Sequence, residues 1–578
     1  MTAYLRTAFS RDLLSSIFSA LRIPYSVLIL FFAFHLTPLF AATGERAMVV
    51  TPDHRATQAA LDVLKQGGNA VDAAVVAGWV MNVVSPQSSG IGGSGLFLFY
   101  DIGTRRILSF DGSVKAPAKA TPGMFLDARG KPLPYQPERN TGGLPVGVPG
   151  LLKMAEGVHA KYGTHKFPFA QLFEPAILLA EKGTEVSGEL SGALRENAER
   201  LILLDPTKAL FFKEGIPLGT GEKFQQPDLV KAFRLIQKKG SSAFYNGAIA
   251  TEIVRDVQKN KFRPGVLEDR DLEDYAAAER EPLHATYQSY DLFSAAPPAD
   301  GGVMLFRALN VLSHFAMPGL GKSAEAYHLL GETQNVAFAY RGGVVDPDLF
   351  DIPLKELLSG AWAQERAGDI KFDQVIHSAK AVGQETGSGT GKKHSGISIM
   401  VVDTHGNIAI LVATLGDAFG SGLRVPGYGF FLNNLLTDFD VDPSSGSSAG
   451  MVSGGQRPRG TESPVLMFKD GKPAVMANAY GPEDPAAVLL NVIVPRIDLG
   501  ASCSEALEFP RVLERGDTLR EEKGLYAQEM IRLKLELLGH KIEKEDAIGL
   551  AQMVCFDPGS GKIEGESDAR GEGEAAGF

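Results

Sequence analysis

The stretch ISIMVVDTHGNIAILVAT, residues 397–414, contains two mostly apolar runs that are rich in β-branched residues and are separated by four turn-forming residues. The runs cover residues 397–403 and 408–414, and Gly406 stands in the turn, where a positive φ is favourable. Two such runs around a short glycine-containing turn predict a β-hairpin. The same pattern in residues 465–479, around Asp470-Gly471, predicts a second hairpin.

Helical patterns precede and follow these strands. The run at residues 96–100 is typical of a strand buried on both faces, with residues 107–111 as its hairpin partner. Most of residues 149–358 is predicted to be helical. Predicted helices cover residues 58–65, 70–84, 151–162, 169–182, 228–239, 324–340 and 486–497. Helices and strand pairs in this order suggest two sheets packed between helical layers.

The composition is that of a soluble globular protein. Of the 578 residues, 44% are apolar and 22% are charged, and the net charge is −11. The basic residues form no stripe, so nucleic acid is not expected as a partner. The spacing of the eleven histidines does not indicate a metal site. The sequence shows no nucleotide-binding loop either, so no cofactor is expected. Cys503 and Cys555 could form one bridge, but two buried thiols are the favoured interpretation.

Two segments are predicted to lie outside the folded core. Residues 1–42 have the order of a secretory signal peptide, because arginines precede an apolar run at residues 25–40 and small residues follow it. The run is shorter than the ~20 residues that a membrane-spanning helix prefers. We therefore expect cleavage near Ala42 and export to a bacterial periplasm, with a retained membrane anchor as the alternative. Residues 381–394 are dominated by Gly, Ser, Thr and Lys and are predicted to be a flexible linker.

Several blocks of the sequence resemble the γ-glutamyltransferase (glutathione hydrolase) family. They follow that family's order along the chain, which is far more specific than a single glycine motif. The blocks include Gly67-Gly68-Asn69-Ala70-Val71-Asp72-Ala73-Ala74, Ser88-Ser89-Gly90-Ile91-Gly92-Gly93, Ala116-Pro117-Ala118-Lys119-Ala120-Thr121, Leu432-Asn433-Asn434, Ser463-Pro464 and Ser567-Asp568-Ala569-Arg570.

The resemblance implies an α+β fold, namely the four-layer αββα sandwich of the N-terminal nucleophile (Ntn) hydrolases. Residues 43–380 would be a large-subunit-like segment and residues 395–578 a small-subunit-like segment of one domain. In this family the precursor cuts itself in the linker, so the two subunits of one chain would be partners. The implied activity transfers a γ-glutamyl group from a small γ-glutamyl or amide ligand to water or an amine.

The catalytic residues that the resemblance implies are partly replaced. The family's threonine nucleophile corresponds to Gly396, which has no side chain. Ser395 is the candidate catalytic nucleophile, provided that a β-bulge turns its side chain into the site; otherwise it is a solvated linker residue. The family's two oxyanion-hole glycines correspond to Gly481 and Pro482. Gly481 is therefore a candidate catalytic residue, whereas a proline has no N–H to donate.

The positions that bind the substrate in the family also differ. The arginine that pairs with the substrate carboxylate corresponds to Ser113, which cannot form a bidentate charged pair. The asparagine that binds the α-amino acid end corresponds to Gly416. Asp438 and Thr461 remain, with Ser113, as candidate substrate-binding residues.

These replacements leave three functions open. The first is an exported γ-glutamyltransferase-like enzyme with a degraded active site. The second is an inactive family member that stays one chain and serves as a binding or structural protein. The third is an Ntn amidase that takes a different acyl group, as the related cephalosporin acylases do.

Overall fold

The predicted hairpin lies at the centre of an antiparallel sheet in the computed structural model of the chain. Strands β12 (His394–Val402) and β13 (Ile408–Asp417) pair on either side of a turn in which Gly406 has a φ of 94°. Strand β13 is buried along its whole length because β3 covers its other edge. The hairpin prediction is therefore confirmed.

The structure describes residues 41–339, 343–376, 394–442, 448–515, 518–526 and 528–578. Residues 42–578 form one compact unit. The predicted signal segment lies outside the described residues up to residue 40, and the predicted linker does so up to residue 393. His394, the last residue assigned to that linker, is already the first residue of β12. No helix of the described part is both long enough and apolar enough to cross a membrane.

Two sheets of seven strands each, as far as the described residues go, form the middle of the unit. The first has the order β21-β2-β12-β13-β3-β4-β9 and the second the order β1-β20-β19-β15-β14-β11-β10. Besides the hairpin, the first sheet contains β21 (Glu574–Gly577), β2 (Met48–Thr51), β3 (Ser94–Asp101), β4 (Arg106–Gly112) and β9 (Ala278–Arg280). The second contains β1 (Ala42–Gly44), β20 (Ile563–Ser567), β19 (Leu550–Phe556), β15 (Lys472–Tyr480), β14 (Val465–Lys469), β11 (Tyr290–Ser294) and β10 (Leu283–Tyr287).

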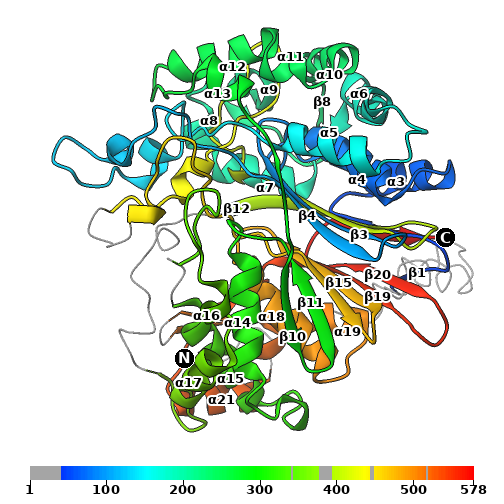
Figure 1. Cartoon of the computed structure of the whole chain (residues 1–578). Helices are drawn as coiled ribbons and strands as arrows, with labels where there is room; N and C mark the ends of the chain where they lie inside the picture. Colours follow the sequence, from blue (N-terminus) through cyan, green and yellow to red (C-terminus); the bar gives the residue numbers. More distant parts are fainter. Residues whose placement is uncertain (1–40, 340–342, 377–393, 443–447, 516–517, 527) are drawn as a thin grey trace, which may run out of the picture. The chain divides into compact units, whose positions relative to one another are not determined.

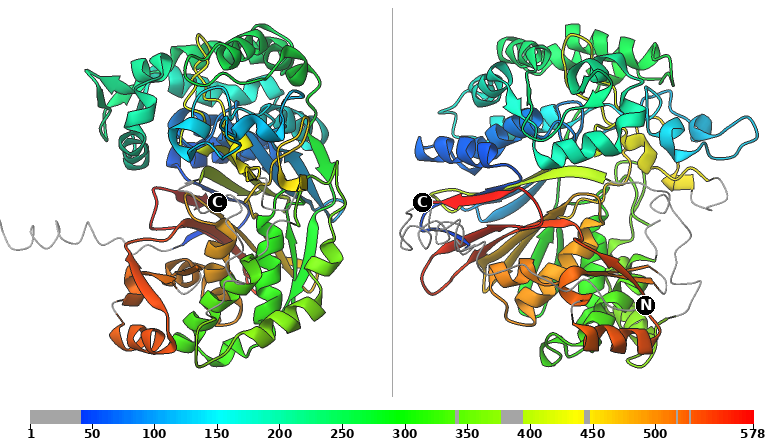
Figure 2. Two further views of the ribbon diagram at one scale, coloured as in Figure 1. Left: turned by 90° about the vertical axis from the view of Figure 1, so that its left-hand side faces the viewer. Right: turned by 180° about the vertical axis from the view of Figure 1, so that it is seen from behind.

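The two sheets pack face to face. Apolar side chains of the first sheet, such as Val50 and Leu98, meet Leu466 and Met476 of the second in one buried cluster. Larger apolar clusters fill the outer faces, where helices cover each sheet. Figures 1 and 2 show these layers from three sides. The unit is thus the αββα sandwich that the sequence predicted.

Each outer layer has its own set of helices. The helices against the first sheet include α3 (His54–Lys65), α4 (Ala70–Val84), α5 (Leu151–Tyr162), α6 (Glu174–Lys182), α10 (Pro227–Lys239), α11 (Ser242–Tyr245), α12 (Ala248–Gln258) and α13 (Asp269–Glu273). The second sheet is covered by α14 (Gly301–Leu312), α15 (Ala324–Phe338), α17 (Gly360–Asp369), α18 (Pro485–Ile497), α19 (Cys503–Glu508) and α21 (Glu529–Leu538). Helix α4 is buried on all sides, as its composition predicted.

Smaller elements lie at the margins. Strands β16 (Val512–Arg515), β17 (Thr518–Glu522) and β18 (Lys541–Glu545) form a three-stranded sheet. Two-stranded pairs are β5 (Thr184–Glu185) with β8 (Lys223–Phe224) and β6 (Phe212–Lys213) with β7 (Ile216–Pro217). Short helices are α7 (Gly188–Glu196), α8 (Ala198–Leu201), α9 (Asp205–Phe211), α16 (Leu354–Leu357), α20 (Lys523–Tyr526) and the 3-10 turns at Pro122–Phe125, Phe169–Phe173, Met317–Gly319, Leu435–Asp438 and Ser448–Gly450, with a π-helical turn at Tyr135–Arg139.

Two local predictions differ from the structure. The segment predicted as one helix over residues 169–182 is a 3-10 turn followed by α6, which starts afresh with Pro175 in its first turn. The largely helical middle also contains the hairpin β10–β11, which extends the second sheet to its edge. Edge strands need only one apolar face, so their pattern is weaker than that of the central strands.

The interpretation of the two cysteines as buried thiols is wrong. Cys503 in α19 and Cys555 in β19 form a disulfide, with their Cα atoms 6.1 Å apart. Helix α19 packs directly on β19, which brings the two backbones within the distance that a disulfide requires. The 52 residues between the two cysteines in the sequence concealed this contact.

Candidate active site

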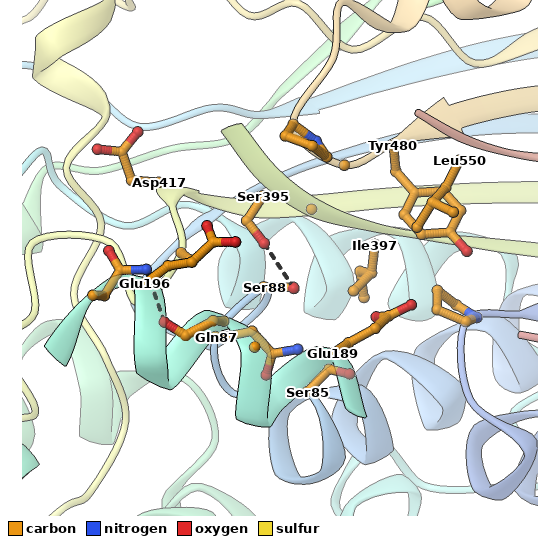
Figure 3. Close-up of a pocket in the computed structure, with 18 of the residues that line it drawn as sticks. Ser85, Gln87, Ser88, Glu189, Glu196, Ser395, Ile397, Asp417, Tyr480 and Leu550 are labelled. Carbon is orange, nitrogen blue, oxygen red and sulfur yellow. Dashed lines mark hydrogen bonds between the residues drawn. The ribbon is translucent and has the colours of Figure 1, made fainter. Parts of the chain in front are cut away.

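A pocket of about 760 Å³ opens where the hairpin, β15 and helix α7 meet. Figure 3 shows its side chains converging from both sheets and from the loop that follows α4. The pocket is lined by Pro52, Ser85, Gln87, Ser88, Tyr135, Gln136, Asn140, Glu189, Gly192, Ala193, Glu196, Asn197, Ser395, Gly396, Ile397, Asp417, Ala418, Tyr480, Gly481, Pro482, Leu550 and Arg570.

Ser395 lies in this pocket at the start of β12. The register between β12 and β13 shifts at this point: Ser395 pairs with Gly416, and the next residue pairs with Thr414. The extra residue of this β-bulge is Leu415 of β13, opposite the start of β12, and Ser395 and Ile397 both line the pocket, as alternate residues of one strand do. The Ser395 hydroxyl oxygen lies 2.7 Å from that of Ser88, as Figure 3 shows. The hydroxyl of Thr414 donates to the carbonyl oxygen of Ser395 next to the bulge.

Gly481 and Pro482 line the same pocket, directly after β15. The φ of Gly481 is 100°, a conformation that residues with a side chain rarely adopt. The residue at this position can therefore present its backbone N–H to the pocket without a side chain in the way. The two catalytic candidates, Ser395 and Gly481, are thus brought together although 86 positions separate their numbers in the sequence.

One side of the pocket is formed by a rigid carboxylate, that of Asp417. The hydroxyl of Tyr135 donates to both of its oxygens, at 2.8 and 2.7 Å. The side-chain amides of Asn140 and Asn434 each donate to Oδ2 at 3.0 Å. Burial and the negative charge of Asp417 raise the pKa of Tyr135, so this hydroxyl stays protonated and remains a donor.

Helix α7 adds two more carboxylates, those of Glu189 and Glu196. Burial, followed by the negative charge of Glu572, raises the pKa of Glu189 to about 7. Arg570 is the cation in the lining, and its guanidinium donates to Glu522 and to Asp568. Because that positive charge is already paired, the pocket favours neutral or cationic groups over anionic ones.

The three candidate substrate-binding residues do not belong to this lining. Ser113 donates its backbone N–H to Asp111, and its carbonyl accepts from the Tyr275 hydroxyl at 2.7 Å. The carbonyl of Thr461 packs against the first turn of α14, where a side chain on Gly301 would come within 2.2 Å of it. Asp438 ends the 3-10 turn that begins at Leu435.

The two arginines close to Ser113 are already paired with carboxylates. Arg280 and Arg457 are close to this segment, and both contact Asp111. Both also contact Asp348, so two carboxylates neutralise the two guanidinium groups. Burial, followed by the positive charge of Arg457, lowers the pKa of the nearby Lys115. This cluster is a closed ion-pair network rather than an anion-binding site.

The position of the family's asparagine is closed to any side chain. Gly416 has a φ of 96°, and a Cβ atom on it would lie 2.1 Å from Oδ1 of Asn434. That same Oδ1 accepts the backbone N–H of Asp417 at 3.0 Å. The glycine therefore leaves room for Asn434 to position Asp417.

The pocket side chains that sequence reasoning missed include Ser88, Asp417 and Glu189. Ser88 lies in a Ser/Gly-rich block that was quoted only for its resemblance. Asp417 directly follows Gly416, the residue that the resemblance aligns with the family's asparagine. A charged residue at the end of a buried strand could have indicated a site residue. Glu189 lies in a helix far from the other blocks, and no feature of the sequence points to it.

Comparisons with known proteins show what this chain is similar to. The family model described as gamma-glutamyltranspeptidase matches residues 56–578. A glutathione hydrolase proenzyme of Bacillus subtilis (strain 168) is 36% identical over 551 residues, which are 93% of this chain and 92% of that protein. An acylase ACY 1 proenzyme of Pseudomonas sp. (strain SE83) is 31% identical over 539 residues, or 92% and 93% of the two chains.

Solved structures show the same likeness. The cephalosporin acylase of Bacillus halodurans superposes with a TM-score of 0.82 at 25% identity and covers 94% of this chain and 98% of its own. The gamma-glutamyltranspeptidase of Helicobacter pylori has a TM-score of 0.53 at 33% identity, over 57% of this chain and 94% of its own.

Proposed function

The chain belongs to the γ-glutamyltranspeptidase family, and we propose that it is a self-processing amidohydrolase whose nucleophile is Ser395. The observation that carries this proposal is the position of the Ser395 hydroxyl, which lies in the pocket, contacts Ser88 and shares the lining with Gly481. A hydroxyl needs a base next to it to become a nucleophile. In this family the base is the free amine of the same residue, which processing creates.

Processing begins at the peptide bond between His394 and Ser395. The Ser395 hydroxyl attacks the carbonyl carbon of His394, the C–N bond breaks, and the amine of Ser395 takes up the proton. Water then hydrolyses the resulting ester, which releases the carboxylate of His394 and restores the hydroxyl. The bulge supports this step because it interrupts the regular pairing of β12 with β13 directly after Ser395.

The mature site then cleaves an amide in two steps. The Ser395 hydroxyl attacks the substrate carbonyl, and its proton passes to the α-amine of Ser395 and from there to the leaving amine. The backbone N–H of Gly481 is the donor to the oxyanion that forms. Water, activated by the same amine, hydrolyses the acyl-enzyme. Ser88 orients the nucleophile throughout by its hydrogen bond.

The acyl group that suits this pocket is one without a free α-carboxylate. The carboxylates of Glu196 and Asp417, and that of Glu189 above about pH 7, line the pocket and repel an anion. Ser113 lies in a separate ion-pair network and cannot replace the family's arginine. The activity proposed first is therefore of the acylase type, and the likeness to an acylase proenzyme supports it.

A γ-glutamyl substrate is the second candidate. It is favoured by the 36% identity to a glutathione hydrolase proenzyme over nearly the whole chain. In that case the α-carboxylate would need a cation that the pocket lining does not offer, so we expect a high KM for γ-glutamyl compounds.

Intact-mass analysis of the purified mature protein tests the proposal. We expect two fragments, the smaller of which starts at Ser395, and one chain of full mature mass for Ser395→Ala. Ser398→Ala is the matched control, because Ser398 lies on the same strand, is fully buried and is not part of the pocket lining. This control should be processed like the parent chain.

The same preparations then identify the acyl group. They are given N-acyl anilides with neutral acyl groups and, in parallel, γ-glutamyl anilide. Faster release from the neutral amides supports the acylase-type activity, and the reverse order supports the γ-glutamyl one. A single stable chain that hydrolyses neither class would overturn both and leave the non-catalytic binding protein.

Export to the periplasm is proposed on two grounds. Residues 1–42 have the composition of a signal peptide, and the disulfide between Cys503 and Cys555 is typical of proteins in oxidising compartments. The mature chain recovered from a periplasmic fraction should begin close to Ala42. A chain that retains residue 1 and stays with the membranes would indicate the anchor instead.

A further inference from the structure

A buried polar cluster lies far from the pocket, where α15 meets the small sheet of β16–β18. It contains Glu332 of α15, Glu514 of β16, and His540, which lies between α21 and β18. Figure 1 shows α15 and α21 next to each other in this region. Glu332 is 0% exposed, and the side chains of Glu514 and His540 are both 0% exposed. One ligand atom from each residue lies within 4.8 Å of the other two.

A chain of hydrogen bonds fixes the tautomer of His540. Nε2 of His328 lies 2.6 Å from the carbonyl oxygen of Lys371, which can only accept, so this nitrogen carries the proton. Nδ1 of a neutral His328 is then an acceptor, and it lies 2.8 Å from Nε2 of His540. Nε2 of His540 must therefore be the donor, and Nδ1 of a neutral His540 carries a lone pair.

That lone pair points at the carboxylates. Nδ1 of His540 is buried and makes no hydrogen bond among the described residues, although Oε2 of Glu514 is only 2.9 Å away. A lone pair beside a carboxylate is repulsive unless a proton or a metal cation lies between them.

We propose that Nδ1 of His540 and one carboxylate oxygen each of Glu332 and Glu514 bind a divalent transition-metal cation of the zinc type. A neutral imidazole with two carboxylates is a ligand set that suits Zn²⁺, with a water as the fourth ligand. Bonds of roughly 2.0–2.1 Å in a tetrahedral site place the ligand atoms about 3.3 Å apart, a spacing between the 2.9 Å from His540 to Glu514 and the 4.8 Å within which all three atoms lie. The cation removes the repulsion and neutralises two buried carboxylates.

The surroundings have the features of a second shell. Metal-binding histidines commonly donate their other N–H to a fixed acceptor, as His540 does to His328. The carboxylate of Glu332 accepts from the backbone N–H of Ile376 at 2.7 Å, which fixes one oxygen. Gly331 allows the approach of the second carboxylate, because a Cβ atom there would lie 2.7 Å from Oε2 of Glu514.

The ligands come from both sides of the proposed cleavage point. Glu332 precedes residue 395, and Glu514 and His540 follow it. Ile376, which contacts Glu332, is the last described residue before the segment that contains the proposed cut. A cation at this site would therefore join the two parts of the chain whether or not the chain is processed.

Metal titration of the whole mature protein tests this site. The protein is dialysed against dipicolinate, freed of the chelator, and titrated with Zn²⁺ by calorimetry, and in parallel with Co²⁺ by visible absorption. We expect one equivalent per chain, a higher unfolding temperature with Zn²⁺, and a Co²⁺ spectrum typical of four-coordinate nitrogen and oxygen ligation. His540→Ala should abolish binding, and His328→Asn should weaken it by about 10–100-fold.

His284→Ala is the matched control, because His284 is a partly exposed histidine on the edge strand β10. Its affinity for Zn²⁺ should equal that of the parent protein. No uptake of Zn²⁺ by the parent protein, or unchanged binding by His540→Ala, would overturn the proposal. If the His540 variant does not fold, X-ray absorption of the Zn²⁺-loaded parent protein decides instead, since a spectrum without imidazole scattering contradicts the site.

Discussion

The hydroxyl oxygens of Ser88 and Ser395 lie 2.7 Å apart, although 307 positions separate the two residues in the sequence. Ser88 comes from the loop that follows α4, and Ser395 is the second residue of β12, next to the bulge in β13. The contact therefore joins a buried helix to the strand that carries the proposed nucleophile. It exists because α4 packs across the hairpin on the outer face of the first sheet.

Removal of the Ser88 hydroxyl should slow both processing and turnover. A neutral hydrogen bond contributes about 0.5–1.5 kcal/mol, so Ser88→Ala is expected to reduce either rate by roughly 2–10-fold without abolishing it. The measurement is a time course of chain cleavage by intact mass, followed by amide hydrolysis. Ser85→Ala is the control, since Ser85 lines the same pocket but makes no hydrogen bond to Ser395 among the described residues. Equal rates for both variants would show that the Ser88 contact has no orienting role.

The sequence was sufficient for the fold and for part of the site. Periodicity predicted the hairpin at β12 and β13 and the burial of α4, because both depend on local patterns. Ser395 could be proposed only on the condition of a bulge, since a register shift at Gly416 depends on how two strands pair. The side chains of Glu189 and Ser88 reach the pocket through long-range packing, which leaves no local pattern.

The same limit explains the disulfide and the polar cluster. Cys503 and Cys555 are brought together by the packing of α19 on β19, and nothing near either cysteine indicates the other. Glu332, Glu514 and His540 come from three separate elements, so their spacing in the sequence does not resemble a metal motif. Ser113, Asp438 and Thr461 were selected by their correspondence to family positions, and none of the three lines the pocket.

The disulfide should contribute substantially to stability. The loop between Cys503 and Cys555 spans 52 residues, and closing a loop of that size in the unfolded chain corresponds to roughly 4 kcal/mol. The double variant with Cys503→Ala and Cys555→Ala should unfold at a clearly lower temperature than the oxidised parent. Dithiothreitol should lower the parent's unfolding temperature to a similar extent and leave the variant unchanged. Two free thiols in denatured, unreduced protein would contradict the bridge.

Glu189 should make stability depend on pH. Its pKa is about 7 in the folded protein and near 4.5 when unfolded, so the folded state binds the proton more tightly. The stability that proton binding by Glu189 contributes to the folded state is therefore fully present below about pH 4.5 and is lost as the pH rises through 7. Glu189→Gln should unfold at the same temperature as the parent at pH 4 and at a higher temperature at pH 8.

The control for this pH effect is Glu185→Gln, which removes an exposed carboxylate from β5. Thermal unfolding of the parent and both variants between pH 4 and 8 gives the comparison. A difference between Glu189→Gln and the parent that is the same at every pH would show that packing, and not the titration of this carboxylate, is responsible.

Pro482 should limit the rate of amide hydrolysis. It follows Gly481 in the pocket lining and has no N–H. Since we propose that this pair forms the oxyanion site, only Gly481 can donate there. A single such donor changes kcat by about 100-fold or more in other hydrolases. Pro482→Gly is therefore expected to raise kcat by up to about 100-fold, with a smaller effect on KM, because the donor acts on the transition state. Pro482→Ala restores the same N–H but gives the backbone less conformational freedom than glycine does. This variant should also have a higher kcat than the parent. An increase for the glycine variant alone would assign the effect to flexibility, and no increase for either would show that the oxyanion accepts from another group.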